Sequence, residues 1–207
     1  MRSQQKAIFA ALLKAKEGSA LKIDAPFLTF GDLLECAGKV SSILGGDAGK
    51  LNRHTVQAWL KQGLLSEGAR SDRNRLFRGL DVIRLATIFQ LSLLGLPAKA
   101  AAAFADQVFA HFEEHFARRW GAIPITPGFE VEDCVWGVAE KDGWTVYRGG
   151  TLDQFHRVLL GKGASAILNA RVLVSFAIAT VGEKWQQKAE SLRDYLVALR
   201  EKGKLAK

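Results

Sequence analysis

Residues 52–65 read Asn-Arg-His-Thr-Val-Gln-Ala-Trp-Leu-Lys-Gln-Gly-Leu-Leu, and they decide how the rest of the chain is interpreted. Asn52 is of a type that caps helix N-termini, because its side-chain oxygen accepts a hydrogen bond from the first turn. Gly63 is of a type that ends helices. The pattern predicts a short helix over 53–62, with Val56 and Leu60 on its inner face at a spacing of four residues.

Basic residues are concentrated around this predicted helix. Residues 50–84 hold eight Lys or Arg and three Asp or Glu, a net charge of +5 out of +8 for the 207-residue chain. A short helix fits the major groove of DNA, and cations in the loop after it can hold the flanking phosphates. Charge alone is equally typical of a solvated basic face on an ordinary helical domain.

Four landmarks in order along the chain resemble the MerR family of transcription regulators. Residues 52–65 resemble that family's recognition helix, which ends in Gly-Leu-Leu and opens into a wing. Arg75-Leu-Phe77 resembles its wing strand, Asp81-Val-Ile-Arg-Leu85 the start of its next helix, and Leu94-Gly-Leu96 the break that follows. Upstream, residues 28–34 resemble the family's opening strand and first helix.

The resemblance covers residues 28–118 and implies a winged helix-turn-helix that binds double-stranded DNA as a homodimer. The chain departs from the family pattern at Gln57, Ala58 and Trp59, where the family has Arg, Tyr and Tyr, and in a longer segment before Asn52. We therefore expect base contacts that differ from those of a typical member. The expected DNA-binding residues are Arg53, His54, Thr55, Gln57, Lys61, Arg70, Arg73, Arg75 and Arg78.

The hydrophobic periodicity predicts the remaining elements. Helices are expected over 32–44, 80–94, from Pro97 to Arg119, and over 152–160, 172–181 and 183–202. Strands are expected over 134–140, 144–148 and 164–169, with a hairpin turn at Lys141-Asp-Gly143. The fold class predicted is mainly α with a smaller α+β part: an N-terminal winged helix-turn-helix followed by a C-terminal α+β domain.

Three parts are expected along the chain. Residues 1–27 form a basic N-terminal arm, and residues 28–120 the winged helix-turn-helix domain with its long following helix. Residues 121–207 form an α+β domain with a C-terminal helix, and this part serves dimerisation or an effector role. The boundary is placed at residues 121–128, where two prolines and two glycines indicate a linker.

Two apolar stripes are candidate dimer interfaces. One recurs every fourth residue on the long helix, at Phe104, Val108, Phe112 and Phe116. The other has the heptad spacing of a coiled-coil seam, at Trp185, Ala189, Leu192, Leu196 and Leu199. The second stripe could pair with another chain or pack back on its own domain. One of the two is required, because a helix of two heptads is only marginally stable by itself.

Two alternatives to a regulator remain open. A DNA-binding architectural protein, such as a phage excisionase-like accessory factor, has the same DNA-reading module. A zinc hydrolase is the third reading, because His111-Phe-Glu-Glu-His115 matches the H-x-x-E-H pattern of inverzincin peptidases. That reading needs a further acidic ligand and a cleft, and a polar helix face explains the same residues. We expect no enzymatic activity, no metal site and no cofactor.

Cys36 and Cys134 have no zinc-ligand spacing, and a reducing cytoplasm fits their number. Each is interpreted as a small buried hydrophobe, with redox sensing as the alternative. The aromatic residues Trp120, Trp136, Trp144 and Tyr147 are interpreted as sheet core, with an effector pocket as the alternative.

No uninterrupted apolar run reaches the ~18 residues of a membrane span, so no membrane partner is expected. RNA polymerase is a candidate partner. The effector and the target genes are not specified by the sequence.

Overall fold

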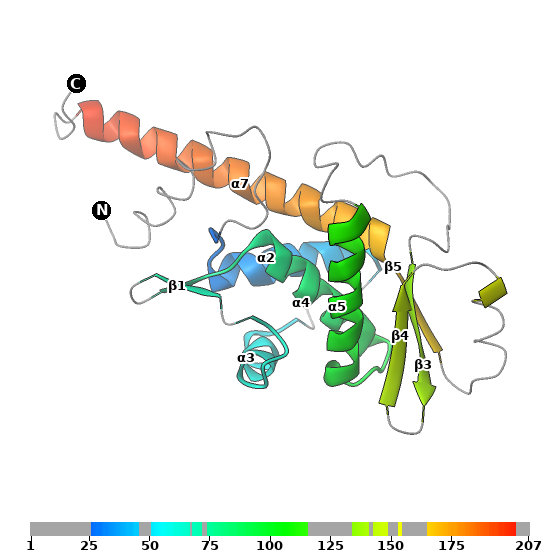
Figure 1. Ribbon diagram of the computed structural model, residues 1–207. Coiled ribbons are helices and arrows are strands. Elements are labelled where there is room, and N and C mark those ends of the chain that lie inside the picture. The colour runs from blue at the N-terminus through cyan, green and yellow to red at the C-terminus, as the bar shows by residue number, and fades with distance from the viewer. Residues whose placement is uncertain are drawn as a thin grey trace.

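The computed structural model describes residues 26–45, 51–66, 68–71, 74–115, 134–140, 143–148, 153–154 and 165–201. Along the chain its named elements are α2 (Phe30–Ile43), α3 (Arg53–Lys61), β1 (Ala69–Ser71), β2 (Asn74–Leu76), α4 (Gly79–Leu93), α5 (Ala98–His115), β3 (Cys134–Glu140), β4 (Gly143–Arg148), β5 (Ser165–Asn169) and α7 (Ala170–Glu201). The described part is mostly helical with a three-stranded sheet at one end, as predicted (Figure 1).

Helix α2 begins two residues earlier than the sequence periodicity predicts. Thr29 is its N-cap, and the Asp32 carboxylate accepts hydrogen bonds from the Thr29 amide at 2.8 Å and the Thr29 hydroxyl at 2.6 Å. The Thr29 hydroxyl oxygen in turn accepts from the Asp32 amide at 3.2 Å. This reciprocal pair is a capping box, so Asp32 lies in the first turn instead of starting the helix.

The β1–β2 hairpin follows α3 and is joined to the segment before α2. Its antiparallel register pairs Arg70 with Arg75. Beyond β2, the Phe77 amide donates to the Leu28 carbonyl at 2.8 Å, and the Leu28 amide donates to the Phe77 carbonyl at 3.0 Å. Gly68 enters the hairpin with φ of 72°, where a Cβ would lie 2.8 Å from the Leu76 carbonyl oxygen. Only glycine fits that position without distortion.

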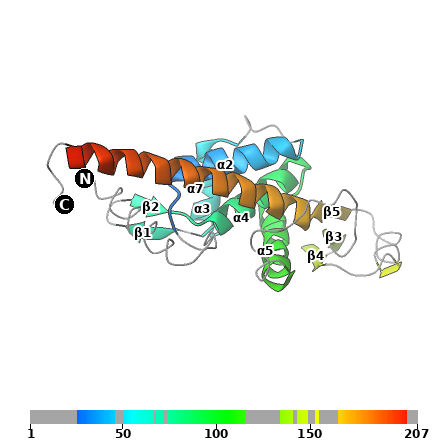
Figure 2. The same ribbon diagram turned by 90° about the horizontal axis from the view of Figure 1, so that it is seen from above.

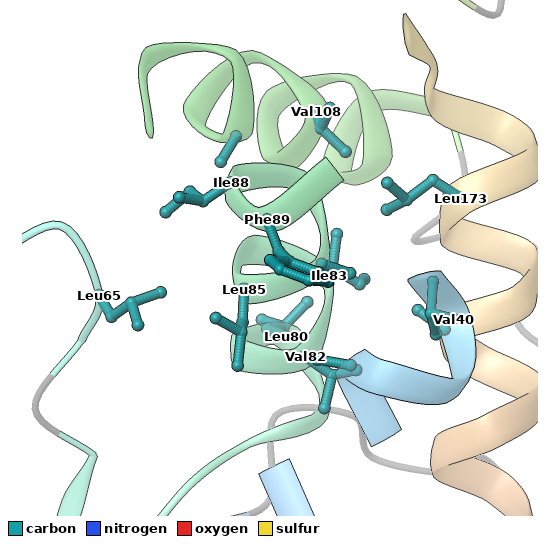
Figure 3. Packing of buried hydrophobic residues seen from close by; sticks show 14 of the residues in the cluster. Val40, Leu65, Leu80, Val82, Ile83, Leu85, Ile88, Phe89, Val108 and Leu173 are labelled. Carbon is teal, nitrogen blue, oxygen red and sulfur yellow. The ribbon is translucent and has the colours of Figure 1, made fainter. Parts of the chain in front are cut away.

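Helix α4 lies at the centre of the molecule. Its residues from Gly79 to Leu91 are buried, with the exception of half-buried Arg84, as expected for a helix that is apolar on all sides. Figure 3 shows side chains from three other elements directed toward it: Val40 of α2, Val108 of α5 and Leu173 of α7. One hydrophobic cluster therefore joins the N-terminal helices to the C-terminal helix.

The three-stranded sheet has the order β4-β3-β5, with both neighbours antiparallel to β3. It packs against α5 through Trp144, whose ring lies 6.0 Å from that of Phe104. On the other face Trp136 stacks on Tyr147 at 4.5 Å and is 3% exposed. These contacts support the interpretation of Trp136 and Trp144 as sheet core. Tyr147 is 38% exposed, so that interpretation is wrong for it, and Trp120 lies outside the described residues.

Helix α7 is continuous from Ala170 to Glu201, so the prediction of two helices separated at Gly182 is wrong. A glycine inside a helix costs only about 1 kcal/mol. Packing on both sides of Gly182 exceeds that cost, because Val181 is fully buried and Trp185 lies edge-on to Phe27 at 4.6 Å. Figure 2 shows α7 running past α2 and continuing beyond it.

Several predicted features lie outside the described residues or side chains. They are the arm at 1–25, the boundary at 121–128, the helix end at 116–119, most of the helix at 152–160, and the side chains of His111, Glu114, His115, Phe112 and Phe116. Among the helices that the structure describes, none combines the length and the apolar character needed to cross a bilayer.

Candidate nucleic-acid interface

Helix α3 has one buried face and one polar face. Val56 is fully buried, and Trp59 is 8% exposed, whereas Leu60 is only half-buried. Trp59 is thus the second side chain, with Val56, that fixes α3 to the core. The spacing of four residues had indicated Leu60 for this position. The exposed residues of the helix are Arg53, His54, Gln57, Ala58 and Lys61, and Thr55 is of intermediate exposure.

Both ends of α3 are stabilised locally as the sequence predicts. The Asn52 side-chain oxygen accepts a hydrogen bond from the Thr55 amide at 2.8 Å. After the last turn Gly63 has φ of 72°, and the Leu64 amide donates to the Trp59 carbonyl at 3.0 Å. Leu65 then re-enters the core at 5% exposure. The helix is therefore held in a defined orientation by its caps and by the turn after it.

Arg53 begins α3 with its guanidinium carbon 5.5 Å from the centroid of the Phe30 ring. A cation over an aromatic face is attracted by the ring quadrupole. This contact places Arg53 at the junction of α2 and α3, with an exposed side chain whose five N–H donors suit guanine or phosphate.

The hairpin carries the next predicted contacts. Arg70 and Arg75 are directly opposite across the two strands, and Arg75 is exposed. Arg73 lies outside the described residues. Figure 1 shows α3 and the hairpin at the same end of the molecule, away from the three-stranded sheet.

The last arginine of the predicted set, Arg78, is the N-cap of α4. Its amide donates to the Asp81 carboxylate at 2.7 Å, and its guanidinium lies 3.5 Å from the other Asp81 oxygen. Asp81 is 3% exposed and also accepts from the Ser66 hydroxyl at 2.6 Å. Asp81 therefore occupies the N-terminus of α4, while the Arg78 side chain remains 42% exposed.

Arg84 belongs to the same basic run but is part of the scaffold. Its Nε donates to the Leu64 carbonyl at 2.7 Å, and its guanidinium bonds Asp106 of α5. The side chain is only 22% exposed. A count of basic residues therefore overstates the charge available to a ligand.

A contact between α7 and α2 was missed in the sequence analysis. Lys188 lies 2.8 Å from one Asp32 oxygen, and Lys184 lies 3.4 Å from the other and 2.6 Å from Glu35. Two signals were available: the Thr29-x-x-Asp32 capping pattern, and two lysines four residues apart beside Trp185. Neither signal names its partner, which lies about 150 residues away along the chain.

The pKa values of this group reflect its contacts. Burial alone would raise the pKa of Asp32, but hydrogen bonds from Lys188 and Thr29 outweigh it and hold the pKa below its ordinary value of 3.8. The hydrogen bond to Glu35 raises the pKa of Lys184 above 10.5 against the opposing effect of burial. The ion pairs are therefore formed throughout the neutral range.

The cysteines are buried and unpaired with each other. Burial, together with the negative charge of Glu35, raises the pKa of the Cys36 thiol to about 11. A thiol in that state is a poor nucleophile, which favours the hydrophobe interpretation over redox sensing. Within the described ranges no three His, Cys, Asp or Glu side chains group as a metal site would require.

Comparison with known families identifies the region that contains this surface. The model of the MerR HTH family regulatory protein matches residues 47–108, from just before α3 into α5. No curated protein matches the chain. The family match confirms the resemblance predicted from the sequence: residues 47–108 of this chain are similar to the MerR helix-turn-helix family.

Proposed function

We propose that this protein is a sequence-specific DNA-binding transcription regulator of MerR-like type, in which α3 reads the major groove and the β1–β2 hairpin is the wing. The observation that supports this function is the two-sided character of α3. Val56 and Trp59 are buried, while Arg53, Gln57 and Lys61 are exposed within the matched region.

The polar face of α3 has the chemistry that base reading needs. A glutamine amide pairs with adenine through one donor and one acceptor, and an arginine pairs with guanine through two donors. Gln57 and Arg53 supply these two groups four residues apart, on the same side of the helix. Thr55 and His54 add shorter donors and acceptors. Lys61, in the last turn, suits a phosphate.

The hairpin suits the flanking backbone. Arg70 and Arg75 occupy directly opposite positions of the hairpin, and Arg75 is exposed, so a DNA backbone beside the hairpin would meet basic residues. Arg73 and Arg78 would extend this contact on either side. We assign these arginines to phosphate or minor-groove contact, because a hairpin beside the recognition helix would lie along the groove edge.

The binding unit is proposed to be a homodimer in the cytoplasm, since one short helix contacts too few base pairs for specificity. Part of each candidate interface is occupied within the chain: Phe104 is buried against the sheet, and half-buried Trp185 packs edge-on against Phe27. From the rest of the two stripes, Phe112 and Phe116 of the first and Leu192, Leu196 and Leu199 of the second remain candidates, and these side chains lie outside those that the structure describes. RNA polymerase contact is proposed for the same assembly, and light scattering with and without DNA tests the dimer.

Genome-wide mapping of bound DNA, followed by binding of the recovered site, tests the function. Sites upstream of genes support a regulator, whereas a recombination site supports an accessory protein. With the recovered duplex, Gln57→Ala should relax base preference at one position by about 1–3 kcal/mol. Gln62→Ala is the matched control, because Gln62 is the exposed C-cap of the same helix. If the wild-type protein binds the cognate and scrambled duplexes with equal affinity, the proposed sequence-specific function is refuted. If Gln57→Ala leaves both affinities unchanged, Gln57 does not read bases.

A further inference from the structure

The segment Phe27–Asp32 lies between the C-terminal helix and the hairpin. On one side, Phe27 meets the Trp185 ring edge-on at 4.6 Å, and Asp32 pairs with Lys188 at 2.8 Å. On the other side, the Leu28 backbone exchanges two hydrogen bonds with Phe77, the residue that follows β2. Contacts from α7 thus lie on both sides of Leu28 along the chain, and the Leu28 backbone is bonded to the base of the hairpin.

Asp32 is the centre of this arrangement. Its carboxylate caps α2 through the Thr29 amide and hydroxyl, and it receives Lys184 and Lys188 of α7 at the same time. The Asp32 side chain is only 13% exposed, so the loss of one partner weakens the compensation of a largely desolvated charge. A displacement of Lys184 or Lys188 therefore acts on Asp32, which is hydrogen-bonded to Thr29. Thr29 is the next residue in the chain after Leu28.

We infer that α7 positions the hairpin through Asp32, so that the C-terminal part of the chain controls DNA affinity without touching DNA. This inference rests on the proposed function of the hairpin as a wing. Lys184, Lys188 and Asp32 are positioning residues in it. When the ion pairs are intact, the Leu28–Phe77 bridge is closed and the hairpin is held at a fixed angle to α3. When they are broken, the bridge opens more often and the contact with DNA weakens.

The test uses the full chain and compares two lysine variants. Lys188→Met removes a cation that pairs with Asp32, and Lys39→Met removes a 48% exposed cation of α2 that lies 3.7 Å from Glu35. The two variants change the net charge equally, so a general loss of attraction to DNA affects both. Lys188→Arg keeps the charge and should restore the wild-type behaviour.

Two readouts are measured on each variant. Amide hydrogen exchange at Leu28 and Phe77, referred to the amides of α4, reports the bridge in the absence of DNA. Titration of the mapped duplex reports the affinity. We expect about tenfold faster exchange and about five- to tenfold weaker binding for Lys188→Met, and less than about twofold changes for Lys39→Met. The double variant Asp32→Asn/Lys188→Met should bind the duplex no more weakly than the weaker-binding single variant, because the two substitutions break the same Asp32–Lys188 contact.

Two outcomes overturn the inference. If Lys188→Met matches Lys39→Met in both readouts, α7 does not hold the bridge. If exchange accelerates while affinity is unchanged, the bridge does not position the hairpin. A wild-type protein that binds no duplex would refute the proposed function, and exchange at Phe77 would then decide the structural link alone. If Asp32→Asn does not fold, the two readouts are measured on Lys184→Met and Lys188→Met alone, because these substitutions leave the Thr29–Asp32 capping box intact.

Discussion

Arg84 Nε donates a hydrogen bond to the Leu64 carbonyl oxygen at 2.7 Å, which ties the central helix α4 to the turn that ends α3. The same guanidinium bonds Asp106, so a single side chain connects α3, α4 and α5. An arginine that looks like a DNA contact in the sequence thereby holds the surface in place. Its removal and the removal of a true contact should have opposite signatures.

Arg84→Ala should reduce stability and leave the salt dependence of DNA binding unchanged. The change leaves the partly buried Leu64 carbonyl without its donor, which costs about 1–3 kcal/mol. Urea unfolding followed by tryptophan fluorescence measures this loss. A slope of log K against log salt that falls by one unit would instead place Arg84 on DNA.

Arg75→Ala should show the reverse pattern. Exposed Arg75 lies opposite Arg70 in the hairpin, and its loss should weaken binding to cognate and random duplexes by the same factor. One fewer released counterion reduces the salt slope by about one unit. Stability should stay within about 0.5 kcal/mol of the wild type. An unchanged slope here and in Arg73→Ala would mean that the hairpin does not touch DNA.

Gly68→Ala should destabilise the chain more than Gly63→Ala. Both glycines have φ of 72°, so both substitutions carry the cost of the left-handed region, roughly 1–2 kcal/mol. At Gly63 nothing lies within 4 Å of the added Cβ, whereas at Gly68 the Leu76 carbonyl oxygen is 2.8 Å away. The difference between the two unfolding free energies isolates the steric contact, and equal losses would contradict it.

The ion pairs between α7 and α2 should limit stability at both ends of the pH scale. The folded-state pKa of Asp32 is lowered, so its contribution is full above 3.8 and is lost as the pH falls through the lower folded value. The folded-state pKa of Lys184 is raised, so its contribution is full below 10.5 and is lost as the pH rises through the higher value. Between these limits the contribution of the pairs should be flat.

Unfolding free energies measured from pH 2 to 11 test this dependence, with Asp32→Asn expected to flatten the acid limb. Asp194→Asn is the control, because Asp194 is an exposed carboxylate of α7. If the two variants have the same acid limb, the Asp32 pairs do not contribute to it.

Local signals in the sequence were sufficient for most elements. Asn52 capped α3 and Gly63 ended it, as predicted, because a cap and a left-handed glycine act within one helical turn. The strands at 134–140, 144–148 and 164–169 agree with β3, β4 and β5 to within a residue at each end. Gly182 shows the limit of such signals, because long-range packing of Val181 and Trp185 outweighed a local helix-breaking tendency.

The sequence by itself determined the type of module, through a short capped helix, a basic loop and the spacing of four landmarks between residues 52 and 96. Only the tertiary structure decided which cations belong to the surface: Arg75 is exposed on the hairpin, whereas Arg84 and Lys184 are joined to carboxylates on other helices. The physical reason is that a charge has no fixed role until the fold supplies its neighbours. Partners 22 and 149 residues away in the chain leave no mark in the local pattern of either residue.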